Sequence, residues 1–247
     1  MKGVILAAGI SSRLRPLTDR VPKCLLEVGG KTILGMALGN LASHGIGKVV
    51  IVTGYREEQI QAFVRDAFPS LDVEFVTNDR FAATNNSYSL WLTERAAGGD
   101  DMLLLDSDIL FDGRIIDLLT RSGYRNCLAM KSGIVLGDEE IKVQVGPGGA
   151  VRRIGKEIPP GAAAGESIGI ELLSREFLDP LYRILERMIT VDLNVNLFYE
   201  AAFQETIEGG VPMTAVDVGQ LQCIEIDTDG DLRAARSGEF SRERRES

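Results

Sequence analysis

The stretch LAAGISSRLRPLTDRVPKCLLEVGGK, residues 6–31, decides how the rest of this chain is interpreted. It follows a short apolar run, Gly3 to Ala7, that predicts a buried strand, and it precedes a helical pattern that begins near Thr32. Ordinary connections between a strand and a helix have about 2 to 6 residues. This connection is several times longer, which indicates that the loop has a function of its own.

The loop combines small residues with spaced cations. Ala7, Ala8 and Gly9 allow backbone N–H groups to approach a ligand, while Arg13 and Lys23 supply fixed positive charge. Such a combination suits phosphate groups. For any one of these residues the alternative is a solvated loop whose cations face water, but the whole string is much harder to explain in that way.

Two common phosphate-binding motifs do not match. The Walker pattern G-x-x-x-x-G-K-[ST] is not present, and Ser11 and Ser12 stand where G-x-G-x-x-G needs glycines. The string instead resembles the signature of the nucleotidylyltransferases that join a nucleoside triphosphate to a phosphorylated small molecule, L-A-A-G-x-x-x-R-L-x-P-L-T-x-x-x-P-K-x-L-L-x-V-x-G-K. Ser11 replaces the commoner glycine, as in the variant of the phosphocholine cytidylyltransferase branch.

The overall composition limits the remaining choices. The chain has 247 residues, 45% of them apolar, which fits one large α/β domain. No apolar run approaches the roughly 18 residues that span a bilayer. The three cysteines, Cys24, Cys127 and Cys223, lack metal-ligand spacing, so we expect a reducing, cytoplasmic setting.

Charge and histidine content exclude several classes of protein. A net charge of -9 argues against nucleic acid or an anionic membrane as the partner, because both need a broad basic surface. His44 is the one histidine, and its place at a helix end favours an interaction with the helix dipole. Ser-His-Asp catalysis and histidine zinc sites are therefore almost excluded.

Strand-like and helix-like segments alternate through the first half of the chain. This β-α-β-α-β-α-β order implies parallel strands with helical crossovers, whose ligands bind beyond the strand C-termini. The expected strands are Lys2–Ala7, Lys48–Thr53, Val73–Val76 and Asp101–Leu105, and the expected helices are Thr32–His44, Glu57–Phe68 and Ser87–Ala97. Four polar segments should then share one edge of the sheet: residues 7–23, 53–55, 78–89 and 106–108.

The segment from Thr84 to Leu90 opens a helix with amide and hydroxyl side chains. These residues can cap the helix, and they can also bind a nucleobase edge or a phosphate. The segment is similar to the N-N-x-x-S-L motif of the phosphocholine-type enzymes. Together with the signature loop, this resemblance implies a nucleotide-binding set of Leu6, Ala7, Ala8, Gly9, Ser11, Asn78, Asn85, Asn86, Ser89 and Asp106.

Carboxylates follow the fourth expected strand. Asp106 and Asp108 repel each other unless a cation lies near them, although acidic residues here can also simply form a turn. The family pattern (G/S)-D-x-x-F implies that Asp108 is the direct Mg²⁺ ligand. The string from Glu225 to Leu232 is similar to the C-terminal E-I-D-T-x-x-D-L motif of the family. This resemblance implies that Asp227 is the second metal ligand.

Beyond Phe111 the alternation fades, and we expect antiparallel strands over residues 126–131, 141–146, 150–156 and 165–173. Helices are predicted over 174–189 and 194–208, followed by short strands over 213–216 and 222–226. Segments similar to R-I-G-K, G-E-x-I-G-I and Y-Y-E imply acceptor-binding roles for Lys156, Glu166, Tyr199 and Glu200. A solvated lysine and a core tyrosine remain the alternatives. Cys223 stands where many choline-type relatives have tryptophan, which weakens the expectation of an aromatic cage.

The resemblance covers Lys2 to Leu232 and implies a mixed-sheet, Rossmann-like three-layer α/β/α sandwich of the GT-A type. Residues 1–236 would form one domain, with 1–111 as the nucleotide-binding half, 112–236 as the acceptor-binding half, and 237–247 as a flexible tail. A homodimer is compatible with this picture.

The implied reaction is the attack of a phosphate or phosphonate oxygen on the α-phosphorus of an NTP, with CTP favoured, and the release of pyrophosphate. Arg13 would hold the β and γ phosphates, and Lys23 would bridge the α-phosphate and the acceptor. The acceptor would be phosphocholine-like or a phosphonate, with sugar, inositol or cyclitol phosphates and UTP or GTP as alternatives. A glycosyltransferase and a non-catalytic nucleotide-binding protein are the alternatives from other classes.

Overall fold

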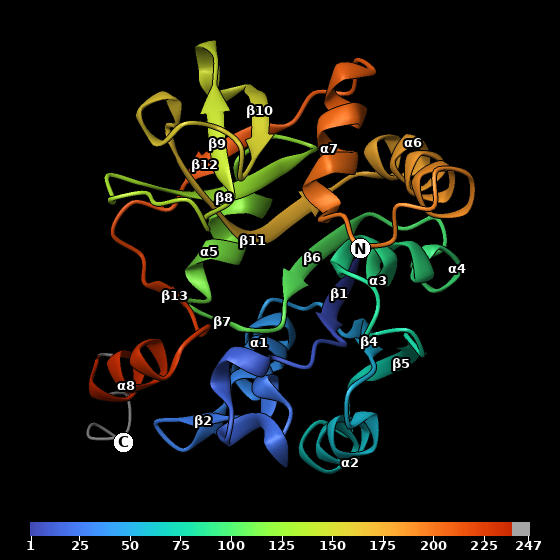
Figure 1. Ribbon diagram of the computed structural model, residues 1–247, viewed down its shortest axis with the longest axis vertical. Helices are drawn as coiled ribbons and strands as arrows, with labels where there is room; N and C mark the ends of the chain where they lie inside the picture. The colour runs from blue at the N-terminus through green and yellow to red at the C-terminus, as the bar shows by residue number, and fades with distance from the viewer. Residues whose placement is uncertain (239–247) are drawn as a thin grey trace.

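The computed structural model describes residues 1–238, and a mixed sheet runs through its centre (Figure 1). The strands lie in the order β10-β9-β11-β6-β1-β4-β5, and β8 pairs with β11 and with β12 beside this path. The first half contributes β1 (Lys2–Ala7), β4 (Lys48–Thr53), β5 (Asp72–Thr77) and β6 (Met102–Asp106). These four strands are parallel, as the alternating pattern predicts.

The second half extends the sheet with β8 (Cys127–Ser132), β9 (Lys142–Val145), β10 (Val151–Gly155), β11 (Gly165–Leu173) and β12 (Thr214–Asp217). Strand β11 pairs antiparallel with β6, β8 and β9, so it joins the parallel half to the antiparallel half. The expectation of a mixed sheet is therefore confirmed. Strand β12 returns parallel to β8.

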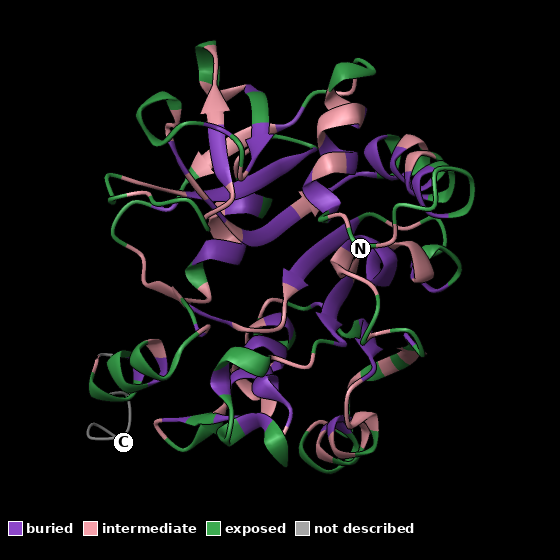
Figure 2. Ribbon diagram, viewed as in Figure 1, coloured by how far each residue is buried: buried purple, intermediate pink, exposed green. Residues whose placement is uncertain are grey.

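Helices cover both faces of the sheet, which makes three layers. Along β1, Val4 and Leu6 face one apolar core, while Ile5 and Ala7 face the other. The first core is closed by α3 (Asn86–Leu92), α6 (Arg175–Glu186) and α7 (Tyr199–Glu208), and the second by α1 (Ile33–Ser43), α2 (Glu57–Ala67) and α5 (Arg114–Thr120). Burial on both faces explains the continuous apolar runs of these strands, which Figure 2 shows as a buried centre.

Two small ribbons lie outside the main sheet. Strand β2 (Glu27–Val28) pairs with β3 (Lys31–Thr32), and β7 (Ile109–Phe111) pairs antiparallel with β13 (Cys223–Glu225). Helix α8 (Asp229–Ser237) follows with a capping box between Thr228 and Asp231. The β7–β13 pairing matters for the site because it brings the segment after β6 next to the end of the chain.

Several boundaries differ from the sequence predictions. The helix expected over 87–97 is two helices, α3 and α4 (Glu94–Ala97), because the Thr93 hydroxyl bonds the Leu90 carbonyl oxygen and the Tyr182 hydroxyl. The helix expected over 194–208 begins only at Tyr199, because a turn at Val195 and Asn196 and an extended Phe198 precede it. Strand β7 and helix α5 were not predicted. Helix α6 ends at Glu186 and continues as a π turn to Val191.

The expected tail, residues 237–247, lies outside the described residues from 239 onward. None of the helices within residues 1–238 combines the length and the apolar character that a bilayer crossing requires.

Candidate active site

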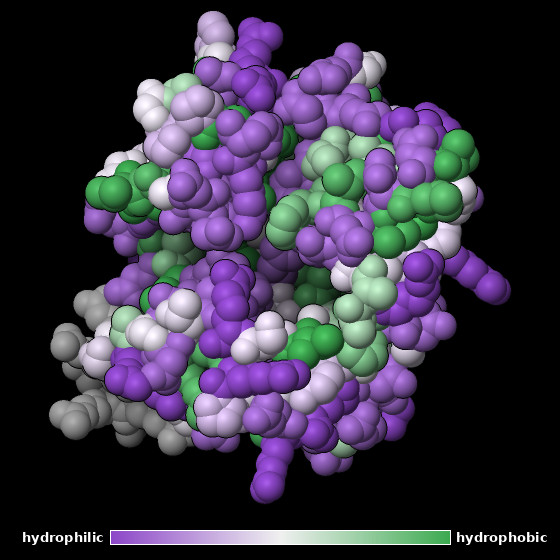
Figure 3. All heavy atoms as spheres, in the orientation of Figure 1, coloured by the Kyte–Doolittle hydropathy of each residue, from purple (hydrophilic) through white to green (hydrophobic). Residues whose placement is uncertain are grey.

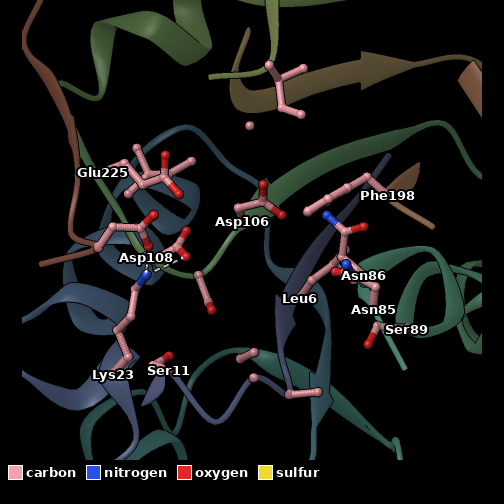
Figure 4. Close-up of a pocket in the computed structure, with 18 of the residues that line it drawn as sticks. Leu6, Ser11, Lys23, Asn85, Asn86, Ser89, Asp106, Asp108, Phe198 and Glu225 are labelled. Atoms are coloured by element: carbon pink, nitrogen blue, oxygen red, sulfur yellow. Dashed lines mark hydrogen bonds and ion pairs between the residues drawn. The ribbon is translucent and has the colours of Figure 1, made fainter. Parts of the chain in front are cut away.

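A cavity of about 580 Å³ opens beyond the C-terminal ends of β1 and β6. Figure 3 shows this face of the molecule hollowed near its centre, and Figure 4 shows the side chains that line the cavity. Ligands bind at this edge in open parallel sheets. The expectation that the signature loop and the segments 78–89 and 106–108 meet there is confirmed.

The signature loop is held in place by short 3₁₀ turns and by hydrogen bonds from α2 and the residues before it. The turns are Ser12–Leu14, Leu17–Asp19 and Lys23–Leu25. The Tyr55 hydroxyl lies 2.9 Å from the Thr18 carbonyl oxygen and 3.0 Å from that of Asp19, and Arg56 donates to Asp19 at 2.7 Å. Segment 53–55 lies at the expected edge of the sheet, next to the loop, but it anchors the loop and does not line the cavity.

Lys23 forms the charged centre of the site. Its Nζ lies 2.6 Å from Asp227 Oδ1 and 2.9 Å from Asp108 Oδ2, and its side chain is only 9% exposed. Burial alone would lower the pKa of Lys23, but the attraction of Asp108 and Asp227 outweighs it and raises the pKa above 10.5. Arg13 reaches the other oxygen of Asp227 at 2.6 Å. The two cations and two carboxylates predicted from distant motifs thus converge in one cavity. Figure 4 shows Lys23 directed toward Asp108.

The residues present fit a divalent cation. One oxygen from each of Asp108, Glu225 and Asp227 lies within 4.8 Å of the others. Asp108 Oδ1 is buried and has no hydrogen-bond partner among residues 1–238. An all-oxygen, anionic donor set is the kind that Mg²⁺ prefers.

Glu225 is the acid that the sequence analysis missed. Partial desolvation in the cavity, followed by repulsion from Asp108 and Asp227, raises the pKa of Glu225 to about 8, although the residue is exposed at the surface. A signal for it existed, because residues two apart on a strand share a face, and Glu225 precedes Asp227 by two positions.

The predicted nucleotide-binding residues also line the cavity. Leu6, Ala7, Ala8, Gly9 and Ser11 line the cavity from β1 and the loop, and Asn85, Asn86 and Ser89 line it from α3. Asn78 is 1% exposed, and its Nδ2 donates to Thr84 Oγ1 and Ser89 Oγ at 3.1 Å each, so Asn78 fixes the segment that leads into α3.

A buried group of acids adjoins the cavity. Asp106 ends β6, and the Tyr199 hydroxyl donates to its Oδ2 at 3.1 Å. Burial, followed by repulsion from neighbouring carboxylates, raises the pKa of Asp106 well above its usual range. Glu171 is fully buried, and burial raises its pKa in the same way. Gly169 keeps the group compact: its φ is +68°, and a Cβ there would lie 2.6 Å from Asp106 Oδ2.

Tyr199 is the predicted site residue that the structure places elsewhere. Its side chain is 0% exposed and packs against Phe203, so the expectation of an acceptor contact is corrected: it supports Asp106 from the core. A tyrosine at the start of an amphipathic helix faces the core unless another element displaces it, and none does here. Its neighbour Glu200 does line the cavity.

The acceptor end carries further charged residues. Lys156 lies 3.1 Å from Glu139 and 4.8 Å from the centre of the Phe198 ring. Burial raises the pKa of Glu166, which lines the cavity, to about 7, and repulsion from Glu140 raises this pKa further.

Lys142 is 1% exposed and donates to the carbonyl oxygens of Gly137, Asp138 and Glu140, so it holds the turn that brings Glu139 and Glu140 to the cavity. Nothing in the sequence pattern indicated Phe198, Glu139 or Glu140.

The fold and the cavity define a three-layer α/β protein in which a loop of small residues and cations adjoins three carboxylates that could hold a metal ion. The family model of the MobA-like NTP transferase domain matches residues 3–134. The chain belongs to this family.

Two curated proteins are similar to the chain. CMP-5'-(3-aminopropyl)phosphonate synthase of Streptomyces rubellomurinus is 28% identical over 95% of the chain and 38% of its own length. Choline-phosphate cytidylyltransferase of Streptococcus pneumoniae is 36% identical over 50% of the chain and 52% of its own length. The chain thus matches about half or less of the length of these relatives.

Solved structures agree on the fold. The structure described as CTP:phosphocholine cytidylyltransferase from Streptococcus pneumoniae has a TM-score of 0.77 at 23% identity and covers 96% of this chain and 97% of its own. The inositol-1-phosphate CTP transferase of T. maritima has a TM-score of 0.76 at 20% identity, over 96% and 94% of the two chains. At these identities the likeness concerns the fold alone.

Proposed function

We propose that this protein is a Mg²⁺-dependent nucleotidylyltransferase that couples CTP to a small phosphorylated or phosphonate acceptor and releases pyrophosphate. The observation that carries the proposal is the contact of Lys23 with both Asp108 and Asp227 at the base of the signature loop. A cation between two carboxylates, next to a loop of small residues, suits a triphosphate with its metal ion.

The reaction needs positioning more than a base. An anionic oxygen of the acceptor attacks the α-phosphorus of CTP, the bond from that phosphorus to the β-phosphate oxygen breaks, and pyrophosphate leaves. The nucleophile is already ionised at neutral pH, so no residue has to remove a proton. Lys23 would hold the α-phosphate and the acceptor, and Arg13 would hold the β and γ phosphates as charge moves onto the leaving group.

Asp108, Asp227 and Glu225 would hold the metal ion. When bound, Mg²⁺ supplies positive charge that neutralises the phosphate oxygens and orients them. Lys23, which contacts two of these carboxylates in the free protein, would contact the phosphates in the complex.

The relatives favour an acceptor with a cationic group, and the acidic end favours an amino group over a quaternary ammonium. One relative is described as an aminopropylphosphonate enzyme and the other as a choline-phosphate enzyme. Glu200 lines the cavity, is 5% exposed, and has one oxygen with no partner among residues 1–238. An unpaired carboxylate favours a cation that can donate a hydrogen bond. Residues 1–111 would bind the nucleotide and residues 112–236 the acceptor, within one domain.

The test is a pyrophosphate-release assay of purified protein with CTP, UTP, GTP or ATP. Each nucleotide is combined with phosphocholine, 2-aminoethylphosphonate, inositol phosphate or glucose 1-phosphate, with and without Mg²⁺. We expect release with CTP and an amino acceptor that depends on Mg²⁺ and is lost in Lys23→Ala. A folded protein that binds nucleotide but releases no pyrophosphate with any pair would favour a binding protein and contradict the proposal.

A further inference from the structure

Helix α7 begins without a cap from its own sequence. Its N-cap residue is Phe198, whose side chain makes no capping bond. The first N–H groups of a helix have no partner within the helix, and a cap usually comes from the preceding Ser, Thr, Asp or Asn. Here the partner comes from another helix: Asn86 Oδ1, at the start of α3, accepts from the Tyr199 N–H at 3.0 Å.

The segment that leads into α7 is held by the same short motif. The Asn85 N–H donates to the Val195 carbonyl oxygen at 2.9 Å, and Asn85 Nδ2 lies 3.4 Å from that of Asn196. At the far end of its side chain, Tyr199 donates to Asp106. Residues 93 to 113 positions apart are thus joined beside the cavity.

This connection fixes two lining residues of the acceptor end. Phe198 and Glu200 flank Tyr199 and both line the cavity. Figure 4 shows Phe198 beside Asn86, across the cavity from Lys23. A change in where α7 begins would move both side chains, whereas the signature loop has its own anchors at Tyr55 and Arg56.

We infer that Asn86 is a positioning residue for the acceptor subsite. Its Oδ1 holds the N-terminus of α7, and through α7 it orients Phe198 and Glu200. This role rests on the proposed function and differs from the nucleobase contact that the family motif implies. The two roles use different atoms, because a base contact through the amide donor needs Nδ2, which makes no bond to another described residue, while the α7 contact needs Oδ1.

Two substitutions distinguish the role of Asn86 Oδ1 from that of Nδ2. Asn86→Ala removes both, and Asn86→Asp keeps an acceptor oxygen but removes the donor. With CTP and the amino acceptor found by the release assay, we expect Asn86→Ala to raise the acceptor KM about tenfold, as the loss of a cap predicts. The KM for CTP should change less than twofold, and Asn86→Asp should restore the acceptor KM to near the wild-type value.

The opposite pattern overturns the inference. A raised KM for CTP in Asn86→Asp would assign the side chain to the nucleobase, and an unchanged acceptor KM in Asn86→Ala would remove it from the acceptor subsite. If the alanine variant does not fold, the aspartate variant alone decides between the two roles.

A hydrogen-exchange measurement on the free protein is independent of turnover. The Tyr199 amide should lose protection in Asn86→Ala and keep it in Asn86→Asp, and equal protection in all three proteins would contradict the capping contact. An inactive wild-type protein in which the Tyr199 amide behaves as expected would refute the proposed function while leaving the cap in place.

Discussion

At the signature-loop end of the cavity, Lys23 and Arg13 contact carboxylates at 2.6 to 2.9 Å, whereas at the α7 end Glu171 and Glu200 each keep an oxygen without a partner among residues 1–238. The loop end pairs opposite charges between its own side chains, and within residues 1–238 only Asp108 Oδ1 of this group is buried without a partner. The α7 end gathers carboxylates, and burial raises the pKa of each.

The two ends of the cavity can therefore accept the charged groups of a ligand in different ways. Paired charges can be exchanged, since phosphates can replace the carboxylates around the cations and a metal ion can replace the cations around the carboxylates. Unpaired buried acids instead bind protons until a positive group arrives. We therefore expect the loop end to govern the rate of transfer. We expect the α7 end to govern the choice of acceptor and to contribute to the pH dependence of stability.

The largest effect should come from Lys23→Ala. Removing the ammonium takes away transition-state stabilisation at the phosphates, and we expect kcat to fall about 10²- to 10³-fold, as for the loss of an oxyanion donor. Pyrophosphate release measures the change. Lys48→Ala, at the exposed start of β4, is the matched control and should behave as wild type. Near-normal activity of Lys23→Ala in a folded protein would remove this residue from the mechanism.

Glu200→Gln should flatten the pH dependence of stability. Burial raises the pKa of Glu200 to about 7 from 4.5, against the lowering effects of its own amide and Lys156. The folded state therefore holds this proton more tightly, and the resulting stabilisation is full below pH 4.5 and is lost as the pH rises through 7. The charged and titratable groups that face Glu200 are Asp106, Glu171, Tyr199 and Lys156.

The shift corresponds to about 3 kcal/mol at most. Urea unfolding of wild type and Glu200→Gln at pH 5 and at pH 8 measures it. The variant should be the more stable protein at pH 8 and should lose the advantage at pH 5. If the free energy of unfolding changes equally between pH 5 and pH 8 in the two proteins, Glu200 ionises normally in the folded state.

Glu225→Gln should weaken the response to metal. The side chain shares the three-carboxylate cluster with Asp108 and Asp227, so its loss should raise the Mg²⁺ concentration for half-maximal release about tenfold, at the low end of what ligand-shell changes cause. Titration of activity with Mg²⁺ at saturating substrates tests this. Asp229→Asn, which removes a nearby carboxylate outside the cavity, should leave the titration unchanged. Identical titrations of Glu225→Gln and wild type would exclude Glu225 as a ligand.

Tyr55→Phe should have the smallest effect. It removes the hydroxyl that holds the Thr18 and Asp19 carbonyl oxygens, a loss of about 1 kcal/mol in the free energy of unfolding. Chemical denaturation measures the loss, and kcat should fall only a few-fold, because Arg56 still donates to Asp19. A fall as large as that of Lys23→Ala would mean that the anchor directly determines the position of Lys23.

The sequence predicted the parallel half of the fold well. Strands β1, β4 and β6 are buried on both faces, so their apolar runs are unambiguous, and amphipathic helices separate the strands. Strand β5 lies at the edge of the sheet and is only partly buried. Strand β7 was missed because it has three residues and pairs only with β13, far along the chain. Local patterns carry no information about such a partner.

The sequence identified mainly those site residues whose side chains line the cavity. All the predicted site residues except Tyr199 line the cavity. The sequence did not identify the residues that hold other parts of the site in place. Tyr55 anchors the signature loop, and Lys142 holds a turn. Their contacts depend on which backbone atoms lie nearby, and a pattern of residue types does not encode that.

The sequence by itself determined which chemical groups the site can use: a loop of small residues with Arg13 and Lys23, carboxylates after two strands, and a net charge that argues against a nucleic acid partner. Residue type and spacing suffice for this, because charge and backbone freedom are local properties. Only the tertiary structure decided which charges meet. Lys23 and Asp227 are brought to 2.6 Å by the β7–β13 pairing, and Asn86 is brought to Tyr199 by the packing of α3 on α7. Contacts between residues so far apart in the chain arise only once the apolar cores have fixed the elements that carry them.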